Sequence, residues 1–138
     1  DVYKRQEEMN VVSPGRGMIL VVDDESVLVD LAVRFLEKSG HRAKGFTAAE
    51  DAMEWYRTNF KSVDMIVLDV KMPGIGGEEC FDQLRKINPE ARVVMLSGYV
   101  HDDTAEALLK KGALKFFQKP LQYPELIQWI NAFLAHSE

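Results

Sequence analysis

The stretch ILVVDDES, Ile19–Ser26, passes directly from four apolar residues into three acidic ones. A continuous apolar run of this kind is typical of a strand that is buried on both faces of a parallel sheet. The carboxylates at its end repel one another, so we expect a positive charge to meet them. The stretch therefore predicts a buried strand that delivers acidic side chains to a cation.

Short apolar runs alternate with helical patterns along the chain, at residues 18–22, 41–46, 65–68, 92–96 and 114–118. Apolar residues three and four apart between these runs indicate helices that return the chain to the next parallel strand. Gly40 and Gly112 are placed to end two helices, and Pro124 is placed to begin the last. Thr47 and Glu50 have the spacing of a capping box. The pattern predicts an α/β fold with five strands and five helices.

Composition limits the classes of protein to which the chain can belong. Its 138 residues suffice for one domain, and a net charge of -5 argues against a nucleic-acid groove, which needs clustered Lys and Arg. No apolar run approaches the roughly 20 residues of a membrane span. Cys80 is the single cysteine, which excludes an internal disulfide and fits a reducing cytoplasm. We expect a cytoplasmic domain without DNA contacts or membrane insertion of its own.

Residues 1–17 are polar and end in a Ser-Pro-Gly-Arg-Gly cluster, so we expect a flexible leader before a domain over residues 18–138. The opening letters DVYKRQ resemble the translation of a sequencing adapter, which would make them an artefact. The true start is then Met9, Met18 or a position upstream.

Ionisable and hydroxyl side chains follow four of the predicted strands. In open α/β sheets, ligands bind outside the carboxyl ends of the strands, so these side chains are expected at one edge. A divalent cation such as Mg²⁺ suits clustered carboxylates, and one carboxylate can then attack a phosphoryl group. A lysine and a hydroxyl can hold the phosphoryl oxygens. The residues concerned are Asp23, Asp24, Glu25, Asp69, Ser97 and Lys119.

In order and spacing, these motifs resemble the receiver domain of two-component signalling, from about Met18 to His136. The resemblance rests on the acidic pair at Asp23 and Asp24, the block LDVKMPGIGG around Asp69, and the LSG and KP motifs. It implies a flavodoxin-like, doubly wound sheet with strand order 2-1-3-4-5.

The resemblance also implies roles for the site residues. Asp69 would accept the phosphoryl group, Asp24 and Asp69 would ligate Mg²⁺ directly, and Asp23 would act through a metal-bound water. The backbone carbonyl of Lys71 would complete the protein ligands. The donor would be a phosphohistidine on a sensor histidine kinase or a histidine phosphotransfer protein, and the domain would turn over no separate substrate.

A switch and a control of phosphate lifetime follow from the same resemblance. Ser97 would move toward the phosphate, and Phe116 would swing into the vacated space, which repacks the face of the fourth helix, fifth strand and fifth helix. By strand alternation, either Phe116 or Phe117 must be ordinary core packing. Lys71 and Tyr99 occupy positions that tune dephosphorylation, and we hypothesise that Tyr99 shields the aspartyl phosphate. A cis peptide at Lys119-Pro120 is a further expectation from the family.

Several alternatives stay open or are disfavoured by the sequence. A haloacid-dehalogenase-type phosphatase needs an Asp-x-Asp spacing that Asp23 and Asp24 lack, and a nucleotide or flavin site needs a phosphate-binding loop in place of DDE. A receiver-like interaction module without phosphorylation is the main functional alternative. The chain fits both a free-standing receiver and the C-terminal receiver of a hybrid sensor kinase, with a phosphorylation-dependent homodimer as one form of output.

Overall fold

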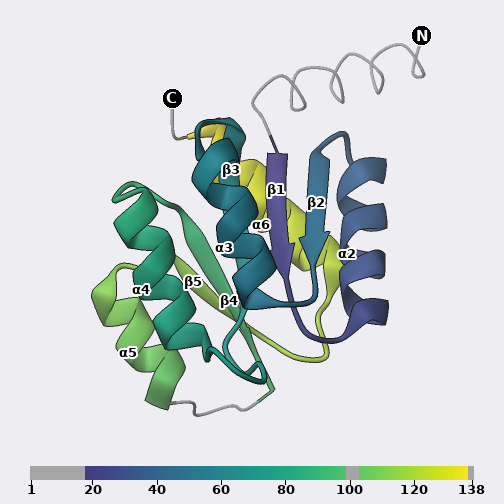
Figure 1. Cartoon of the computed structure of the whole chain (residues 1–138). Helices are drawn as coiled ribbons and strands as arrows, with labels where there is room; N and C mark the ends of the chain where they lie inside the picture. The colour runs from purple at the N-terminus through teal and green to yellow at the C-terminus, as the bar shows by residue number, and fades with distance from the viewer. Residues whose placement is uncertain (1–17, 99–102, 137–138) are drawn as a thin grey trace, which may run out of the picture.

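The computed structural model describes residues 18–98 and 103–136 of the chain (Figure 1). The predicted leader, residues 1–17, and the proposed shielding residue Tyr99 lie outside the described residues. No helix in the described part of the chain is long and apolar enough to cross a membrane.

Strands and helices alternate as the sequence pattern predicts. The strands are β1 (Met18–Val22), β2 (Arg42–Phe46), β3 (Val63–Asp69), β4 (Val93–Ser97) and β5 (Lys115–Gln118). The helices are α2 (Ser26–Lys38), α3 (Ala49–Asn59), α4 (Gly77–Ile87), α5 (Asp103–Lys111) and α6 (Tyr123–Ala135), with a short 3-10 helix, η2 (Phe60–Ser62), before β3. The prediction of five strands and five α-helices is confirmed for this part of the chain.

The five strands form one parallel sheet in the order β2-β1-β3-β4-β5, so the expected order is also confirmed. The chain moves outward from β1 to β2 and then returns across β1 to β3, which makes the β1–β3 boundary the point where the strand order reverses. Ligands of doubly wound sheets bind at this point, outside the carboxyl ends of the strands. Asp69 ends β3 there, and Asp23 follows β1.

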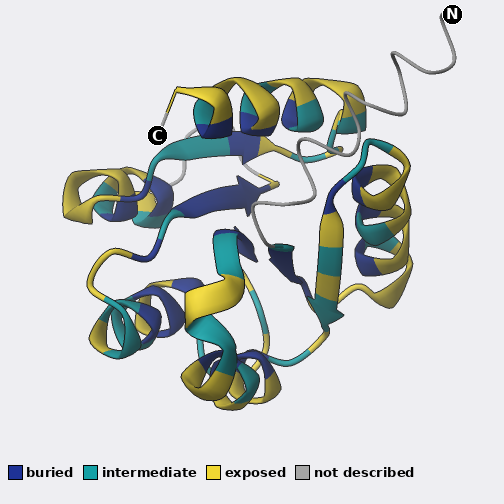
Figure 2. Cartoon of the chain, turned by 90° about the horizontal axis from the view of Figure 1, so that it is seen from above, coloured by how far each residue is buried: buried dark blue, intermediate teal, exposed yellow. Residues whose placement is uncertain are grey.

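Helices cover both faces of the sheet (Figure 1), and the buried residues gather between the layers (Figure 2). Alternate residues of each central strand enter opposite cores, as the period of two in a strand requires. One core lies between the sheet and α3, α4 and α5, and includes Leu20, Ile66, Met95, Phe81 and Leu108. The other lies against α2 and α6, and includes Ile19, Val67, Leu96, Leu36 and Ile130.

The helix ends predicted at Gly40 and Gly112 hold, Pro124 lies in the first turn of α6 as expected, and the capping box fails. Gly40 and Gly112 follow α2 and α5 with φ of 98° and 116°, the left-handed region that favours glycine. The capping-box prediction is wrong, because α3 begins at Ala49 with Ala48 as its N-cap. Thr47 therefore lies one residue outside the position from which a hydroxyl caps the first turn.

Candidate functional site

Three carboxylates meet where the strand order reverses. Val22 and Leu68 are paired across β1 and β3, and the next residues along each strand are Asp23 and Asp69. Ligand atoms of Asp23, Asp24 and Asp69 lie within 4.8 Å of one another. Asp23 is 1% exposed and Asp69 is 3% exposed, whereas Asp24 is exposed to solvent. The sequence prediction that these acids come together is thus confirmed.

Backbone amides orient the two buried carboxylates. The N–H of Glu25 donates to Oδ1 of Asp23 at 3.0 Å, and the N–H of Lys71 donates to Oδ1 of Asp69 at 3.1 Å. In both cases the donor lies two residues after the acid, so a tight local turn holds the carboxylate. Each Oδ1 is therefore engaged locally, and each Oδ2 faces the centre of the site.

Lys119 supplies a positive charge at that centre. Its Nζ lies 2.9 Å from Oδ2 of Asp23, 3.2 Å from Oδ2 of Asp69 and 3.4 Å from Oε1 of Glu25. Its backbone N–H donates to the carbonyl of Ser97 at 2.7 Å, which fixes the lysine to the end of β4. The peptide bond from Lys119 to Pro120 is cis, as the family resemblance predicts.

The pKa values of Asp69 and Lys119 are both raised, which favours the neutral carboxyl of Asp69 and the charged ammonium of Lys119. Burial, together with the charge of Asp23, raises the pKa of Asp69 to about 7, against the opposing effects of the Lys71 amide and of Lys119. Burial acts to lower the pKa of Lys119, but its contact with Asp23 and the charge of Asp69 outweigh burial and raise that pKa. The lysine is therefore held charged beside Asp69, whose anionic form burial disfavours.

The donor set fits a hard divalent cation. Oδ2 of Asp23 is buried, and its charged contact among the described residues is Nζ of Lys119 at 2.9 Å. Two buried carboxylates and one exposed carboxylate converge within the distance that a single ion can span. Mg²⁺ prefers such oxygen ligands and keeps part of its coordination for water and phosphate.

The remaining predicted residues lie on β4, on β5 and in the loop after β3. Ser97 is buried at the end of β4, and Lys71 is exposed in the loop after Asp69. Phe116 is half-buried against the core of α3, α4 and α5, whereas Phe117 is buried on the other face and packs edge-on against Trp129. The expectation that one of the two phenylalanines is ordinary core packing is confirmed, and that residue is Phe117.

Two features were not foreseen from the sequence. Glu25 was counted in the acidic stretch but was given no role, and its carboxylate reaches Lys119. Tyr123 stacks on Phe35 of α2, with ring centroids 4.7 Å apart, and its hydroxyl is buried without a hydrogen-bond partner among the described residues. The DDE run was a signal for the first feature, whereas nothing in the sequence indicated the second.

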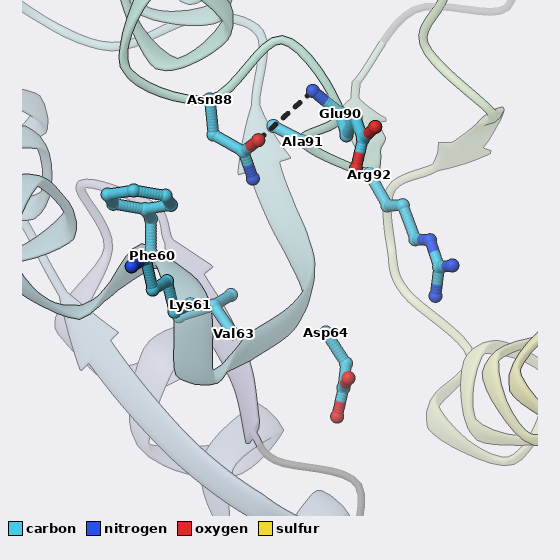
Figure 3. Close-up of a pocket in the computed structure, with 8 residues that line it drawn as sticks. All are labelled: Phe60, Lys61, Val63, Asp64, Asn88, Glu90, Ala91 and Arg92. Carbon is cyan, nitrogen blue, oxygen red and sulfur yellow. Dashed lines mark hydrogen bonds between the residues drawn. The ribbon is translucent and has the colours of Figure 1, made fainter.

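A separate cavity of about 490 Å³ lies at the opposite edge of the sheet (Figure 3). Val63, which begins β3, and Arg92, which precedes β4, both line it, so β3 separates this cavity from Asp69 by roughly 20 Å. The side chain of Asn88 accepts a hydrogen bond from the N–H of Glu90 there, and the guanidinium of Arg92 lies over the ring of Phe133. Among the described residues, the group of three acidic side chains close enough to share an ion is at the Asp69 end of β3 and not at this cavity.

Comparison with known proteins agrees with the geometry. Residues 19–131 match the sequence model of the response regulator receiver domain. The nitrogen assimilation regulatory protein NtrX of Azorhizobium caulinodans is 33% identical over 111 residues, which are 79% of this chain and 24% of NtrX. The sensor kinase CckA of Brucella abortus is 28% identical over 124 residues, which are 90% of this chain and 13% of the kinase. The chain thus spans a quarter or less of these relatives.

Solved structures show the same fold. A chain in the crystal structure of the CheX-CheY-BeF3-Mg²⁺ complex from Borrelia burgdorferi superposes with a TM-score of 0.79 and 25% sequence identity. The superposition covers 86% of this chain and 89% of that chain.

Proposed function

Because the chain belongs to the response regulator receiver domain family, we propose that it accepts a phosphoryl group on Asp69 from a phosphohistidine of a partner protein. Receiver domains are signalling domains, and this one would promote its own phosphorylation and dephosphorylation without turning over a separate substrate. The observation that carries the proposal is the convergence of Asp69, Asp23 and Lys119 within ion-pair distance at the reversal of strand order.

The proposed step is a displacement at phosphorus. A carboxylate oxygen of Asp69 forms the new P–O bond as the P–N bond of phosphohistidine breaks, and the imidazole keeps the electron pair and takes up a proton. Lys119 can neutralise one phosphoryl oxygen, and the hydroxyl of Ser97 can donate to another. The contact with Lys119 acts against burial on the pKa of Asp69, so the ion pair favours the ionised form of the nucleophile.

Mg²⁺ is the cofactor that we propose for this step. Asp23, Asp24, Asp69 and the backbone carbonyl of Lys71 would hold the ion, and the buried Oδ2 of Asp23 supports this assignment. When bound, the ion neutralises charge on the phosphoryl oxygens.

The output is proposed to be a repacking of the face made by α5, β5 and α6. Movement of the Ser97 hydroxyl toward the phosphate would leave space for Phe116, and the half-buried position of Phe116 leaves its ring less constrained than that of Phe117. Because Phe116 has no hydroxyl, the change would act through buried apolar area. Lys71 and Tyr99 remain the proposed residues that tune dephosphorylation.

The partners follow from the phosphoryl source. A sensor histidine kinase or a histidine phosphotransfer protein would deliver the group, and the matched relatives include both a regulatory protein and a sensor kinase. The same phosphoryl transfer would serve a free-standing receiver or the receiver of a hybrid sensor kinase. The output could then be a homodimer or another protein bound through the α5–β5–α6 face.

Intact mass spectrometry after incubation with acetyl phosphate and Mg²⁺ tests the proposal. We expect one phosphoryl adduct on the parent protein, and no adduct on the Asp69→Asn variant or when the metal is chelated. Asp64→Asn, at the far end of β3, is the matched control and should be phosphorylated like the parent. A folded parent protein that binds the metal but gains no mass would favour the alternative, a receiver-like interaction module that works without phosphorylation.

A further inference from the structure

Glu25 is the third carboxylate around Lys119 and differs from the other two in exposure. Its Oε1 lies 3.4 Å from Nζ of Lys119, and its side chain is 60% exposed, whereas those of Asp23 and Asp69 are 1% and 4% exposed. Its backbone N–H orients Asp23, so the residue contacts the site at both ends. Glu25 is also the N-cap residue of α2.

Three carboxylates of the cluster lie within ion-pair distance of the ammonium of Lys119. Asp23, Asp24, Glu25 and Asp69 together oppose the single ammonium of Lys119. An incoming phosphoryl group is itself anionic and must contact that ammonium. Any carboxylate that already holds Lys119 competes with the phosphoryl oxygens for the same donors.

Building on the proposed function, we infer that Glu25 is a positioning residue that restrains Lys119 and slows phosphorylation of Asp69. The buried acids are held by local backbone hydrogen bonds, but the Glu25 carboxylate lies on the solvent side. It is therefore the partner that an arriving phosphoryl group can displace from Lys119. Its departure would free the ammonium at the moment when the phosphoryl oxygens reach the site.

Glu25 can be neutralised without disturbing the fold. Its side chain makes no capping hydrogen bond to the first turn of α2 within the described residues, so glutamine removes no helix cap. Because the carboxylate is exposed, its removal also leaves no cavity in either core. Glu37→Gln, at the other end of α2, removes the same charge from the same helix and is the matched control.

The test compares the phosphorylation rates of the parent, Glu25→Gln and Glu37→Gln with acetyl phosphate at saturating Mg²⁺. We expect Glu25→Gln to react about two- to tenfold faster, as removal of one partly screened charge near the ammonium implies, and Glu37→Gln to match the parent. Beryllofluoride binding, measured by calorimetry, gives a second readout that involves no reaction. Glu25→Gln should bind it more tightly by a similar factor.

A double-mutant cycle with Lys119→Met separates action through the lysine from general charge repulsion. In the Lys119→Met background, Glu25→Gln should no longer change beryllofluoride affinity. An undiminished effect in that background, or equal rates for Glu25→Gln and Glu37→Gln, would overturn the inference while the proposed function stands. If the parent neither forms an adduct nor binds beryllofluoride, both the proposed function and this inference are overturned.

Discussion

The two edges of the sheet carry charged residues in opposite ways. At the carboxyl edge, Asp23 and Asp69 are almost fully buried and share one lysine. At the amino edge, Lys61 and Glu90 are exposed around the cavity of Figure 3, and Asp64, in β3, is half-buried. Both edges lie at the ends of the same buried strands, so the sheet itself does not require the difference.

The carboxyl edge differs because it buries two carboxylates whose loss of solvent is only partly offset by Lys119. Two carboxylates taken out of water repel each other, and the raised pKa of Asp69 records that cost. The exposed charges of Lys61 and Glu90 contribute little to stability in either direction. A fold that keeps buried carboxylates close together, where exposure to solvent would relieve their repulsion, marks the position of a reactive site.

The largest effect should come from disturbing the loop that leaves Asp69. A Cβ on Gly77 would lie 2.5 Å from the carbonyl oxygen of Val70 and 2.6 Å from its Cα, which are backbone atoms with little freedom to move. We expect Gly77→Ala to lower the free energy of unfolding by about 3 kcal/mol, measured by urea denaturation. Such a loss would show that the carboxyl edge depends on close packing of this loop.

Gly76→Ala is the control for that prediction. A Cβ on Gly76 meets no atom within 4 Å, and its φ of -71° suits any residue. Gly76→Ala should lower the free energy of unfolding by at most about 1 kcal/mol, the loss expected for alanine at a helix N-cap. Similar losses for the two variants would mean that general loop flexibility, and not contact with Val70, sets the stability.

A smaller loss of stability is expected when Lys119 is replaced. Lys119→Met leaves the buried Asp23 and Asp69 without their ammonium partner, so we expect a loss of about 2 kcal/mol at pH 8 by urea denaturation. The loss should shrink at pH 6, because a proton on Asp69 then removes one of the two charges. The equivalent change at the amino edge, Lys61→Met, should leave the unfolding free energy unchanged. Equal losses for the two lysines would erase the distinction between the edges.

The fold and the residues that form the site could be predicted from the sequence for the same physical reason. Continuous apolar runs identify strands buried on both faces, and the residue after each run must then lie at the carboxyl edge. Asp69 and Lys119, fifty residues apart, could be placed together on that basis alone.

Side-chain geometry could not be predicted in the same way. The reach of Glu25 to Lys119 depends on the turn after β1 and on the rotamers of two long side chains, neither of which follows from periodicity. The stacking of Phe35 on Tyr123 depends on how α2 and α6 pack. The capping box failed because α3 begins one residue later than the position of Thr47 requires, a shift too small for a sequence pattern to fix.

The smallest effect, and the one of opposite sign, concerns Asp69 itself. Because its pKa is raised from 3.8 to about 7, the folded protein holds this proton more tightly than the unfolded chain does. The contribution of the group to stability is therefore present in full below about pH 4 and is lost as the pH rises toward 7. Asp69→Asn removes the titrating group, so without Mg²⁺ the variant should be more stable than the parent by about 1–2 kcal/mol at pH 8.

Urea denaturation of the parent and Asp69→Asn from pH 4 to pH 8, with the metal chelated, measures this difference directly. The gain should shrink steadily toward pH 4, where the folded carboxyl is protonated and the unfolded one is protonated in part. Glu90→Gln, at the amino edge, should show no such pH-dependent gain, because its carboxylate is exposed. A difference between the parent and Asp69→Asn that stays constant with pH would mean that the amide acts through packing or hydrogen bonding. The buried charge of Asp69 would then not be what destabilises the carboxyl edge.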